Sequence, residues 1–334
     1  MRHNQFVLLV IVTGFMSGCS LKYTIDEPTP SHFTYQNVDK KPVVMKVIDQ
    51  RKDAKFSPGI SGLRKVDIIF ENVTDPAAWL SKGLEKEFVA RGIPMQIVGK
   101  DSNMPPDMTL TIKEYQVVNH RASGFSAWEA YHLFLGQVTK GDKSCTIPAY
   151  FFNSKLPVWS MNEIEKPCLS IPMSIMVKEI ASKINRCVFN YSISDEDLKK
   201  IEALAMEKVK PETEFACFPS IELGGTNNPA AMKTLQKIAD NEDSLVRSCA
   251  VSAMGTLGAQ DQFNDLTNKF AQFSNNDKII PLKSIGDIGS TQAMDFVRKV
   301  KTDELYGDEN GVKYCVDLYL DSETGITKGA ELNK

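Results

Sequence analysis

Residues 108–119 read MTLTIKEYQVVN, and apolar and polar side chains alternate along most of this stretch. Such a period of two is typical of a β-strand that buries one face. Residues 127–139 alternate in the same way. Residues 144–152 and 156–164 then have the pattern of a hairpin that turns at Asn153-Ser154-Lys155. This part of the sequence predicts a run of neighbouring antiparallel strands.

Two helices are expected beside these strands. Asp75-Pro76 supplies an N-cap followed by proline at the first helical position, and Gly92 ends the helix that begins there. Residues 171–187 have the apolar stripe of a second amphipathic helix. Two further strands are expected at 42–49 (PVVMKVID) and 93–98, whereas the residues between the first of them and the first helix are expected to form a loop.

These elements together predict an α+β domain at 42–190, with a mainly antiparallel sheet and two helices packed on it. Asp49-Gln50-Arg51 at the end of the first strand and Asp75-Pro76 at the start of the first helix resemble the YajG-like lipoproteins of Gram-negative bacteria. The resemblance implies an outer-membrane lipoprotein without a known catalytic site. Asp49 and Arg51 are interpreted as surface residues that do not form a pair.

The N-terminal residues have the pattern of a lipoprotein export signal. Arg2 precedes the apolar residues 6–15 (FVLLVIVTGF), which are too few to span a membrane as a helix, because that takes about 20 residues. Met16-Ser17-Gly18-Cys19 resembles a lipobox, which implies cleavage before Cys19 and lipidation of that cysteine. Ser20 stands where an aspartate would favour inner-membrane retention, so the outer membrane is implied. The alternatives are an ordinary signal peptide and a buried apolar strand with a chance cysteine.

The predicted lipidation divides the N-terminal residues into two segments. Residues 1–18 would be removed as the signal peptide. Residues 19–41 are largely polar, contain two prolines and show no hydrophobic period. We therefore expect them to form a tether that lifts the folded part of the protein off the bilayer.

The second half of the chain repeats with a period of 31 residues. Gly255-Thr256-Leu257-Gly258 recurs as Gly286-Asp287-Ile288-Gly289, and Gly224 precedes Gly255 by the same interval. Helix pairs at a fixed period bury their apolar faces by stacking into a solenoid. The pattern resembles HEAT-like repeats of the phycobilisome-lyase type, and the alternative is a helical bundle with a coincidental period. The expected units are 213–240, 243–273 and 276–302, with a capping helix at 309–321.

The remaining boundaries follow from these two regions. Ser194-Asp195-Glu196-Asp197 has the pattern of a helix start, because serine can cap the helix and the acids complement its dipole. Residues 191–211 are therefore predicted to form a linker helix. The HEAT-like, all-α domain is placed at 212–321 and a C-terminal tail at 322–334.

Six cysteines remain after the predicted lipidation site, and an even number suits disulfides in an oxidising periplasm. The 31-residue period brings Cys217 within one residue of the register of Cys249 on the neighbouring helix, so we predict a bond between them. In the expected hairpin, Cys145 lies opposite about residue 164, which brings Cys168 within reach. Cys187 and Cys315 would then remain buried thiols, and the alternative is that all six are buried thiols.

Composition and motifs argue against several kinds of chemistry. The chain has 39 Lys and Arg against 42 Asp and Glu, without a basic stripe that would bind nucleic acid. Beyond the signal only His32, His120 and His132 remain, and none can be assigned as a metal ligand. Residues 306–311 (YGDENG) resemble part of a calcium loop but lack two of its acidic ligands, so a helix-capping turn is favoured. We therefore assign no catalytic, cofactor-binding or metal-binding residue.

We expect a non-enzymatic lipoprotein on the periplasmic side of the outer membrane. Its solenoid would bind another envelope protein and support the assembly or stability of a complex. One alternative is a binding module that holds a small envelope ligand, a glycan or a lipid, on the N-terminal sheet. The other is an enzyme, because the short repeats resemble those of chromophore lyases. An apolar cleft over the sheet would favour the ligand, and an exposed apolar patch on the solenoid would favour the protein partner.

Overall fold

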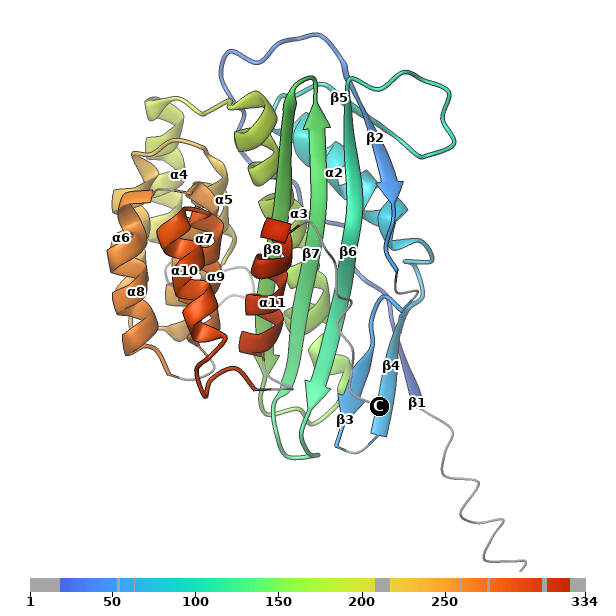
Figure 1. Ribbon diagram of the computed structural model, residues 1–334, viewed down its shortest axis with the longest axis vertical. Helices are drawn as coiled ribbons and strands as arrows, with labels where there is room; N and C mark the ends of the chain where they lie inside the picture. The colour runs from blue at the N-terminus through green and yellow to red at the C-terminus, as the bar shows by residue number, and fades with distance from the viewer. Residues whose placement is uncertain are drawn as a thin grey trace, which may run out of the picture.

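The computed structural model describes residues 19–324 apart from 53–54, 63, 208–216, 259, 275–276 and 308–310. The protein is α+β, with a curled mixed sheet and helices packed around it (Figure 1). The predicted signal peptide lies outside the described residues, as do the ends of the predicted linker helix and tail and the middle of the 306–311 turn. Within the described part, no helix is both long enough and apolar enough to cross a membrane.

Three long antiparallel strands form the centre of the sheet: β6 (Met108–Arg121), β7 (Trp128–Lys140) and β8 (Lys143–Lys155). Residues of both faces are buried in the middle of β6 and β7, because helices cover the sheet on both sides. The predicted hairpin within 144–164 is wrong. A single strand, β8, continues to Lys155, and its hairpin partner is β7, joined to it at Gly141 in the left-handed conformation.

The other strands make the sheet mixed, which corrects the expectation of a mainly antiparallel one. Strand β2 (Val43–Asp49) lies between β5 (Met95–Val98) and β6 and runs parallel to both. A second group holds β3 (Gly59–Ser61), β4 (Arg64–Phe70) and β1 (Cys19–Tyr23), in which β3 is parallel to β6 and β1 is parallel to β4. Parallel neighbours need crossover connections, and the connection from β2 to its parallel neighbour β5 includes β3, β4 and the helix at 76–90. Strands β3 and β4 also replace part of the loop predicted before that helix.

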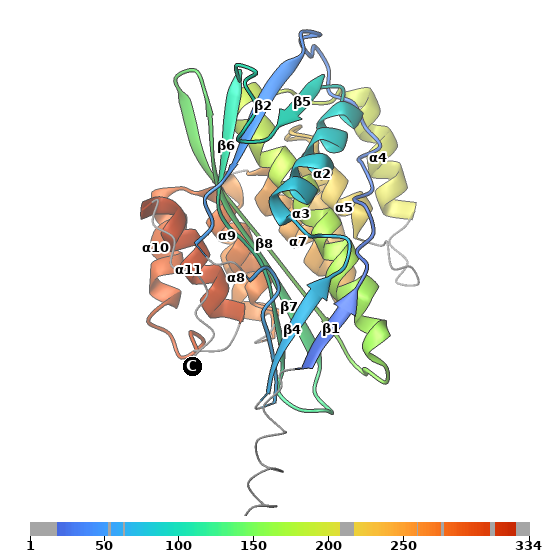
Figure 2. The same ribbon diagram turned by 90° about the vertical axis from the view of Figure 1, so that its right-hand side faces the viewer.

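The segment predicted as a tether, 19–41, is packed against the body of the protein. Its first residues form β1, and the rest, which we name the strap (residues 24–41), runs along the helices (Figure 2). Ile25, Phe33 and Tyr35 are buried, and the backbone N–H of Thr29 donates to Ser174 Oγ at 3.1 Å. The buried residues of the strap are two or three positions apart (25, 28, 31, 33, 35 and 38), and the polar residues between them hide this irregular pattern in the sequence.

Helices enclose the edge strand β8. Helix α2 (Pro76–Ala90) and helix α3 (Ile171–Ile184) lie on one side of the sheet, and α11 (Gly311–Thr324) packs on the other side of β7 and β8 (Figures 1 and 2). Between α3 and α11, a row of three adjacent helices passes around β8: α5 (Phe218–Gly225), α7 (Ser244–Leu257) and α9 (Ile279–Ile288). The outer helices are α4 (Asp195–Glu207), α6 (Ala231–Ala239), α8 (Phe263–Gln272) and α10 (Thr291–Val300). Short helical turns complete the chain: η1 (Met161–Ile164), η2 (Glu165–Ser170), η3 (Asn185–Phe189) and η4 (Gln260–Gln262).

The 31-residue period corresponds to contacts between the inner helices. A Cβ atom on Gly255 would lie 2.5 Å from Ser284 Cα of α9, and one on Gly224 would lie 2.7 Å from the Ala253 carbonyl oxygen of α7. These glycines therefore let neighbouring helices approach each other closely. Three residues after each repeat glycine the backbone is left-handed, at Asn227, Gly258 and Gly289.

One hydrophobic core runs through both halves of the chain. Tyr131 of β7 packs on Tyr314 of α11 with ring centroids 5.3 Å apart, and Tyr150 of β8 donates a hydrogen bond to the Gly311 carbonyl oxygen at 2.9 Å. A smaller cluster around Trp128 and Ile164 fills the end of the sheet near β1. The regions at 42–190 and 212–321 thus share buried contacts across the predicted linker.

Candidate functional site

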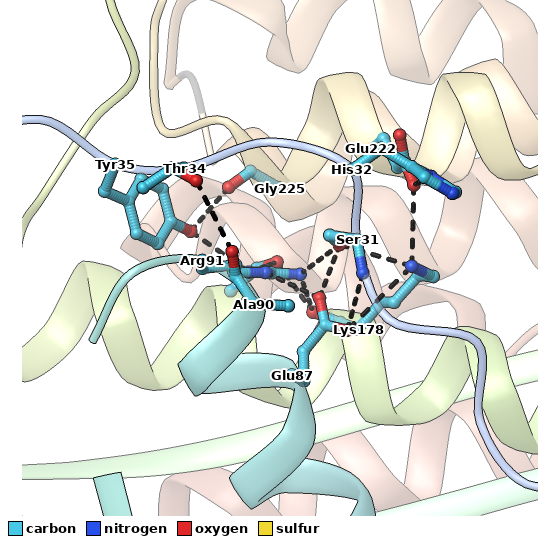
Figure 3. A network of polar contacts seen from close by, with 11 residues as sticks. Ser31, His32, Thr34, Tyr35, Glu87, Ala90, Arg91, Lys178, Glu222 and Gly225 are labelled. Atoms are coloured by element: carbon cyan, nitrogen blue, oxygen red, sulfur yellow. Dashed lines mark hydrogen bonds and ion pairs between the residues drawn. The ribbon is translucent and has the colours of Figure 1, made fainter. Parts of the chain in front are cut away.

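A buried network of charges joins the strap to three helices (Figure 3). Glu87 of α2 pairs with Arg91 one turn later, with 2.6 Å between Oε1 and Nε. Lys178 of α3 lies between two carboxylates, 3.9 Å from Glu87 Oε2 and 3.6 Å from Glu222 Oε1 of α5. The backbone N–H of Ser31 in the strap donates to Glu87 Oε2 at 3.0 Å. Two carboxylates thus balance two cations.

Neutral partners complete this first network. The Arg91 guanidinium donates to Tyr35 Oη at 3.0 Å and to Ser182 Oγ at 2.8 Å, and the Tyr35 hydroxyl donates to the Gly225 carbonyl oxygen at 2.7 Å (Figure 3). Burial by itself would raise the pKa of Glu87, but the charges of Arg91 and Lys178 outweigh it and hold that pKa below its usual value. Glu87 is therefore ionised in the folded protein at neutral pH.

A second buried network joins α3 to α9 and α11. Lys183 Nζ lies 2.6 Å from Glu179 Oε1 and 2.5 Å from Asp287 Oδ1. Lys283 Nζ lies 2.9 Å from Glu179 Oε2 and 2.7 Å from Asp287 Oδ2. The Tyr319 hydroxyl of α11 also donates to Asp287. Burial would raise the pKa of Asp287, but the two lysines outweigh it and lower that pKa.

Both networks tie helices of the second half to the sheet region, and neither is open to a substrate. The charged side chains of the two networks expose at most 4% of their surface. None of the sequence motifs described above points to these residues. A signal was present, because Glu87–Arg91, Glu179–Lys183 and Lys283–Asp287 are opposite charges four residues apart on largely apolar helices.

The disulfides confirm one predicted pair and correct the other. Cys217 is bonded to Cys249, which joins the start of α5 to α7, as the repeat predicted. Cys145 is bonded to Cys187 and not to Cys168, which is a buried thiol like Cys315. The reason is that the predicted hairpin is absent. Strand β8 carries the chain to the far end of the sheet, and α3 returns along β8 so that the following turn η3, which contains Cys187, reaches Cys145.

The other polar residues considered in the sequence have structural partners. Asp49 and Arg51 do form a pair, with 2.8 Å between Oδ2 and Nη2, because the strand ends at Asp49 and the chain turns beyond it. His132 is buried and lies 2.8 Å from the Cys168 carbonyl oxygen, and His120 lies 3.2 Å from Glu129. His32 is exposed at the edge of the first network, and its Nδ1 lies 2.8 Å from Glu222 Oε1. Among the described residues, no group of His, Cys, Asp and Glu is arranged to hold a metal ion.

An open groove of about 560 Å³ lies between α4 and α6. Leu198 and Met206 supply its apolar lining. Glu202 accepts a hydrogen bond across the groove from the Thr234 hydroxyl at 2.6 Å, and Asp195 accepts one from the Asn228 amide at 2.9 Å. The carboxylates of the groove thus have partners within the protein.

Three lysines surround this groove: Lys199, Lys233 and Lys237. All three are exposed, and within the described residues none has an ion-pair partner. The groove therefore presents cationic groups around an apolar lining, a combination suited to a segment with acidic and apolar side chains.

Cys19, the predicted lipidation site, is the first residue of β1 and pairs with Val66 of β4. This part of the sheet is at the lower end of the molecule in Figure 1, whereas α4 is near the upper end. The predicted anchor and the groove are therefore well separated along the long axis of the molecule.

Comparisons with known proteins identify no family for this chain. No protein family model matches it, and no curated protein matches its sequence. One similar solved structure is an uncharacterized protein, with 12% identity and a TM-score of 0.32, covering 50% of this chain and 99% of that one. Another is a DUF330-family protein from Xanthomonas campestris, with 9% identity and a TM-score of 0.31, covering 48% and 92%. These scores are too low to support an argument about fold or function.

Proposed function

We propose that this protein is a non-enzymatic lipoprotein of the outer membrane that binds a segment of another envelope protein in the groove between α4 and α6. The observation that carries the proposal is the groove itself, which combines the apolar side chains of Leu198 and Met206 with three lysines that lack ion-pair partners in the described part of the chain. The expected occupant is a helix or extended segment with apolar anchors and acidic side chains.

The position of the groove supports this role. Lipidation at Cys19 would hold the opposite end of the molecule at the membrane and direct the groove toward the periplasm (Figure 1). We further propose that α5 to α10 are HEAT-like repeats and that the sheet region is YajG-like, which would place the groove between α4 and the first repeat. The 31-residue spacing of the close helix contacts supports the repeat assignment.

A ligand on the sheet is less well supported than a protein in the groove. The predicted ligand site required an apolar cleft over the sheet, but helix α3 and helix α11 pack on opposite sides of β7 and β8. An enzyme is also less well supported, because the two strongest charge clusters are buried and balanced internally.

Photo-crosslinking in intact cells tests the groove. A photoreactive amino acid replaces Met206, which is 37% exposed beside the lysines. We expect a discrete crosslinked product that is lost when Lys199 and Lys233 are both changed to Glu, because the reversed charges would repel an acidic segment. The matched control is Lys299→Glu, an exposed lysine on α10, and it should leave the product unchanged. Equal crosslinking in the charge-reversed protein would contradict the proposal.

The anchor has a separate test. Fatty-acid labelling of cells should mark the wild-type protein, and Cys19→Ser should abolish the label and leave an uncleaved or soluble protein after membrane fractionation. The folded body should be unaffected. A labelled, membrane-bound Cys19→Ser protein would show that lipid is attached elsewhere.

A further inference from the structure

The end of the molecule that holds Cys19 is built from four parts of the chain, which we name the Cys19 pole. They are the start of β1, the β3–β4 hairpin, the loop at 122–127 and the segment at 156–160 (Figures 1 and 2). The register of the sheet places them together, because Cys19 pairs with Val66 and Asn119 pairs with both Gly59 and Ala130. The two loops extend beyond this row of residues.

Three large apolar side chains project from the two loops of this pole. Phe125 is 97% exposed, Trp159 is 86% exposed and Leu156 is 63% exposed. No other large hydrophobic side chain in the described residues is as exposed as these. Single exposed apolar residues are ordinary, but three on neighbouring loops at one end of a protein suggest a contact surface.

The loops that present these side chains are held by hydrogen bonds. The buried Arg121 guanidinium donates to the carbonyl oxygens of Gly124 at 2.5 Å and Ser126 at 3.2 Å, which fixes the loop around Phe125. The backbone N–H of Trp159 donates to Glu163 at 3.3 Å. The exposed side chains are therefore displayed by ordered backbone rather than left out of the core by a loose end.

The anchor point has no spacer. Tyr23, four residues after Cys19, is buried, and its hydroxyl donates to the Met161 carbonyl oxygen at 2.8 Å. Because a chain spans at most about 3.6 Å per residue, a lipid on Cys19 would keep this pole at the membrane surface. The tether predicted from the sequence would have allowed the body to move away, but the packed strap does not.

We propose that the Cys19 pole is a membrane-contact surface in which Phe125, Leu156 and Trp159 enter the headgroup region of the bilayer beside the lipid anchor. The inference rests on the lipidation of Cys19 in the proposed function and adds the contact that the protein itself makes. Aromatic side chains are favoured at this depth of a membrane, and a second attachment reinforces an acyl anchor.

Charge at the pole also suits a phospholipid surface. Arg64 and Lys65 of the β3–β4 hairpin are exposed and directly precede Val66, the partner of Cys19. Neither has an ion-pair partner among the described residues. Basic groups beside an apolar patch attract anionic headgroups. A protein partner would have to share the same surface with the anchoring lipid.

Trp159 allows a direct test, because the chain has only three tryptophans and the other two are half-buried (Trp79) or buried (Trp128). A chain that begins at Cys19 is coupled through that thiol to maleimide-bearing vesicles of phosphatidylethanolamine and phosphatidylglycerol. The other cysteines are bonded or buried. The emission of Trp159 is obtained by subtracting the fluorescence spectrum of the Trp159→Phe variant from that of this protein.

We expect the Trp159 emission to shift to shorter wavelength on coupling and to lose most of its intensity when the lipids carry brominated acyl chains. Phe125→Ser with Leu156→Ser should weaken the quenching, whereas Val89→Ser, which removes a 55% exposed side chain near the end of α2, should not. Emission that is the same with and without bromine would overturn the proposal. A shift without quenching, together with dimers in sedimentation, would assign the pole to a second copy and also overturn it.

The anchor in this assay is supplied by chemical coupling, so the result does not depend on how the cell processes the chain. If fatty-acid labelling fails in cells but Trp159 is quenched on vesicles, the lipidation is wrong and the membrane surface stands. If labelling succeeds and Trp159 is not quenched, the anchor stands and the membrane surface is wrong.

Discussion

Lys283 shows how much a single buried charge can determine in this protein. It lies on the largely apolar helix α9, exposes 1% of its side chain, and contacts both Glu179 and Asp287. Withdrawing these charges from water is costly, and only their close, balanced arrangement offsets that cost. The pairing joins α9 to α3 and therefore joins the two halves of the chain.

We predict that Lys283→Met lowers the free energy of unfolding by about 3–5 kcal/mol, because it leaves a buried negative charge without compensation. Adding Asp287→Asn restores the balance of charge and should recover part of the loss. Lys299→Met, an exposed control on α10, should change stability by no more than about 0.5 kcal/mol. Urea unfolding measures all three, and a fully destabilised double variant would argue against charge balance as the cause.

His132 makes the stability depend on pH. Burial lowers its pKa from the ordinary 6.5 to about 4. Among the described residues its Nδ1 has no hydrogen-bond partner, so none of them would accept a hydrogen bond from a proton added there. Between these two pKa values the unfolded chain binds a proton at this position and the folded protein does not. The contribution of His132 to the free energy of unfolding is therefore complete above pH 6.5 and is lost as the pH falls toward 4.

We predict a loss of roughly 2 kcal/mol of stability between pH 7 and pH 5 from this residue, at about 1.4 kcal/mol for each unit below 6.5. In His132→Phe the loss of stability between pH 7 and pH 5 should be smaller by that amount, whatever the variant's stability at pH 7. Urea unfolding at several pH values decides the matter. An unchanged slope in the variant would place the pH dependence on other groups.

At the scale of the element, the repeat glycines set the distance between helices. A Cβ on Gly255 would lie 2.5 Å from the backbone of α9, and one on Gly286 would lie 2.6 Å from the Tyr319 ring. Close helix crossings of this kind leave no room for a methyl group unless the backbone moves. The disulfide between Cys217 and Cys249 adds a covalent link between α5 and α7, the pair that Gly224 brings close together.

We predict that Gly255→Ala destabilises the protein by about 1–3 kcal/mol, although alanine is the better helix former, because the contact with Ser284 cannot yield without separating α7 from α9. Gly99→Ala is the matched control, since no atom lies within 4 Å of the added Cβ. Thermal unfolding compares them. A neutral or stabilising Gly255→Ala would show that these helices are not held at the distance described.

At the scale of the whole molecule, the row of inner helices passes around the free edge of the sheet at β8. Strand β8 is an edge strand, and helices α3, α9 and α11 all pack against it. An edge covered in this way is protected from pairing with another chain. The cover also means that the second half of the chain is not a separate module, because its helices complete the core of the first.

The continuous core predicts one cooperative unfolding transition for the whole chain. Calorimetry should give a single peak whose calorimetric and van't Hoff enthalpies agree. Independent domains at 42–190 and 212–321 would instead give two transitions or a broad peak with unequal enthalpies. Lys283→Met should lower the temperature of this single transition without splitting it in two, because both halves of the chain depend on the network that the substitution breaks.

Local patterns in the sequence were enough for the longer helices and strands and for one disulfide. The apolar stripes and Asp75-Pro76 predicted helices that are present as α2 and α3, and alternation predicted strands β6 and β7. The 31-residue period predicted the bond between Cys217 and Cys249. Each of these depends on residues near in sequence or related by a fixed interval, so a linear reading can find them.

Only the tertiary structure decided how these elements face one another. The mixed sheet, the Cys145–Cys187 bond and the packing of the strap all depend on contacts between distant residues. The same holds for the charge networks, in which each i,i+4 pair is visible in the sequence but its burial is not. Whether a residue is buried depends on which other parts of the chain pack over it. For Lys283, Phe125 and Trp159 those parts are far away in the sequence, so local sequence patterns cannot show that the first is buried and the other two are exposed.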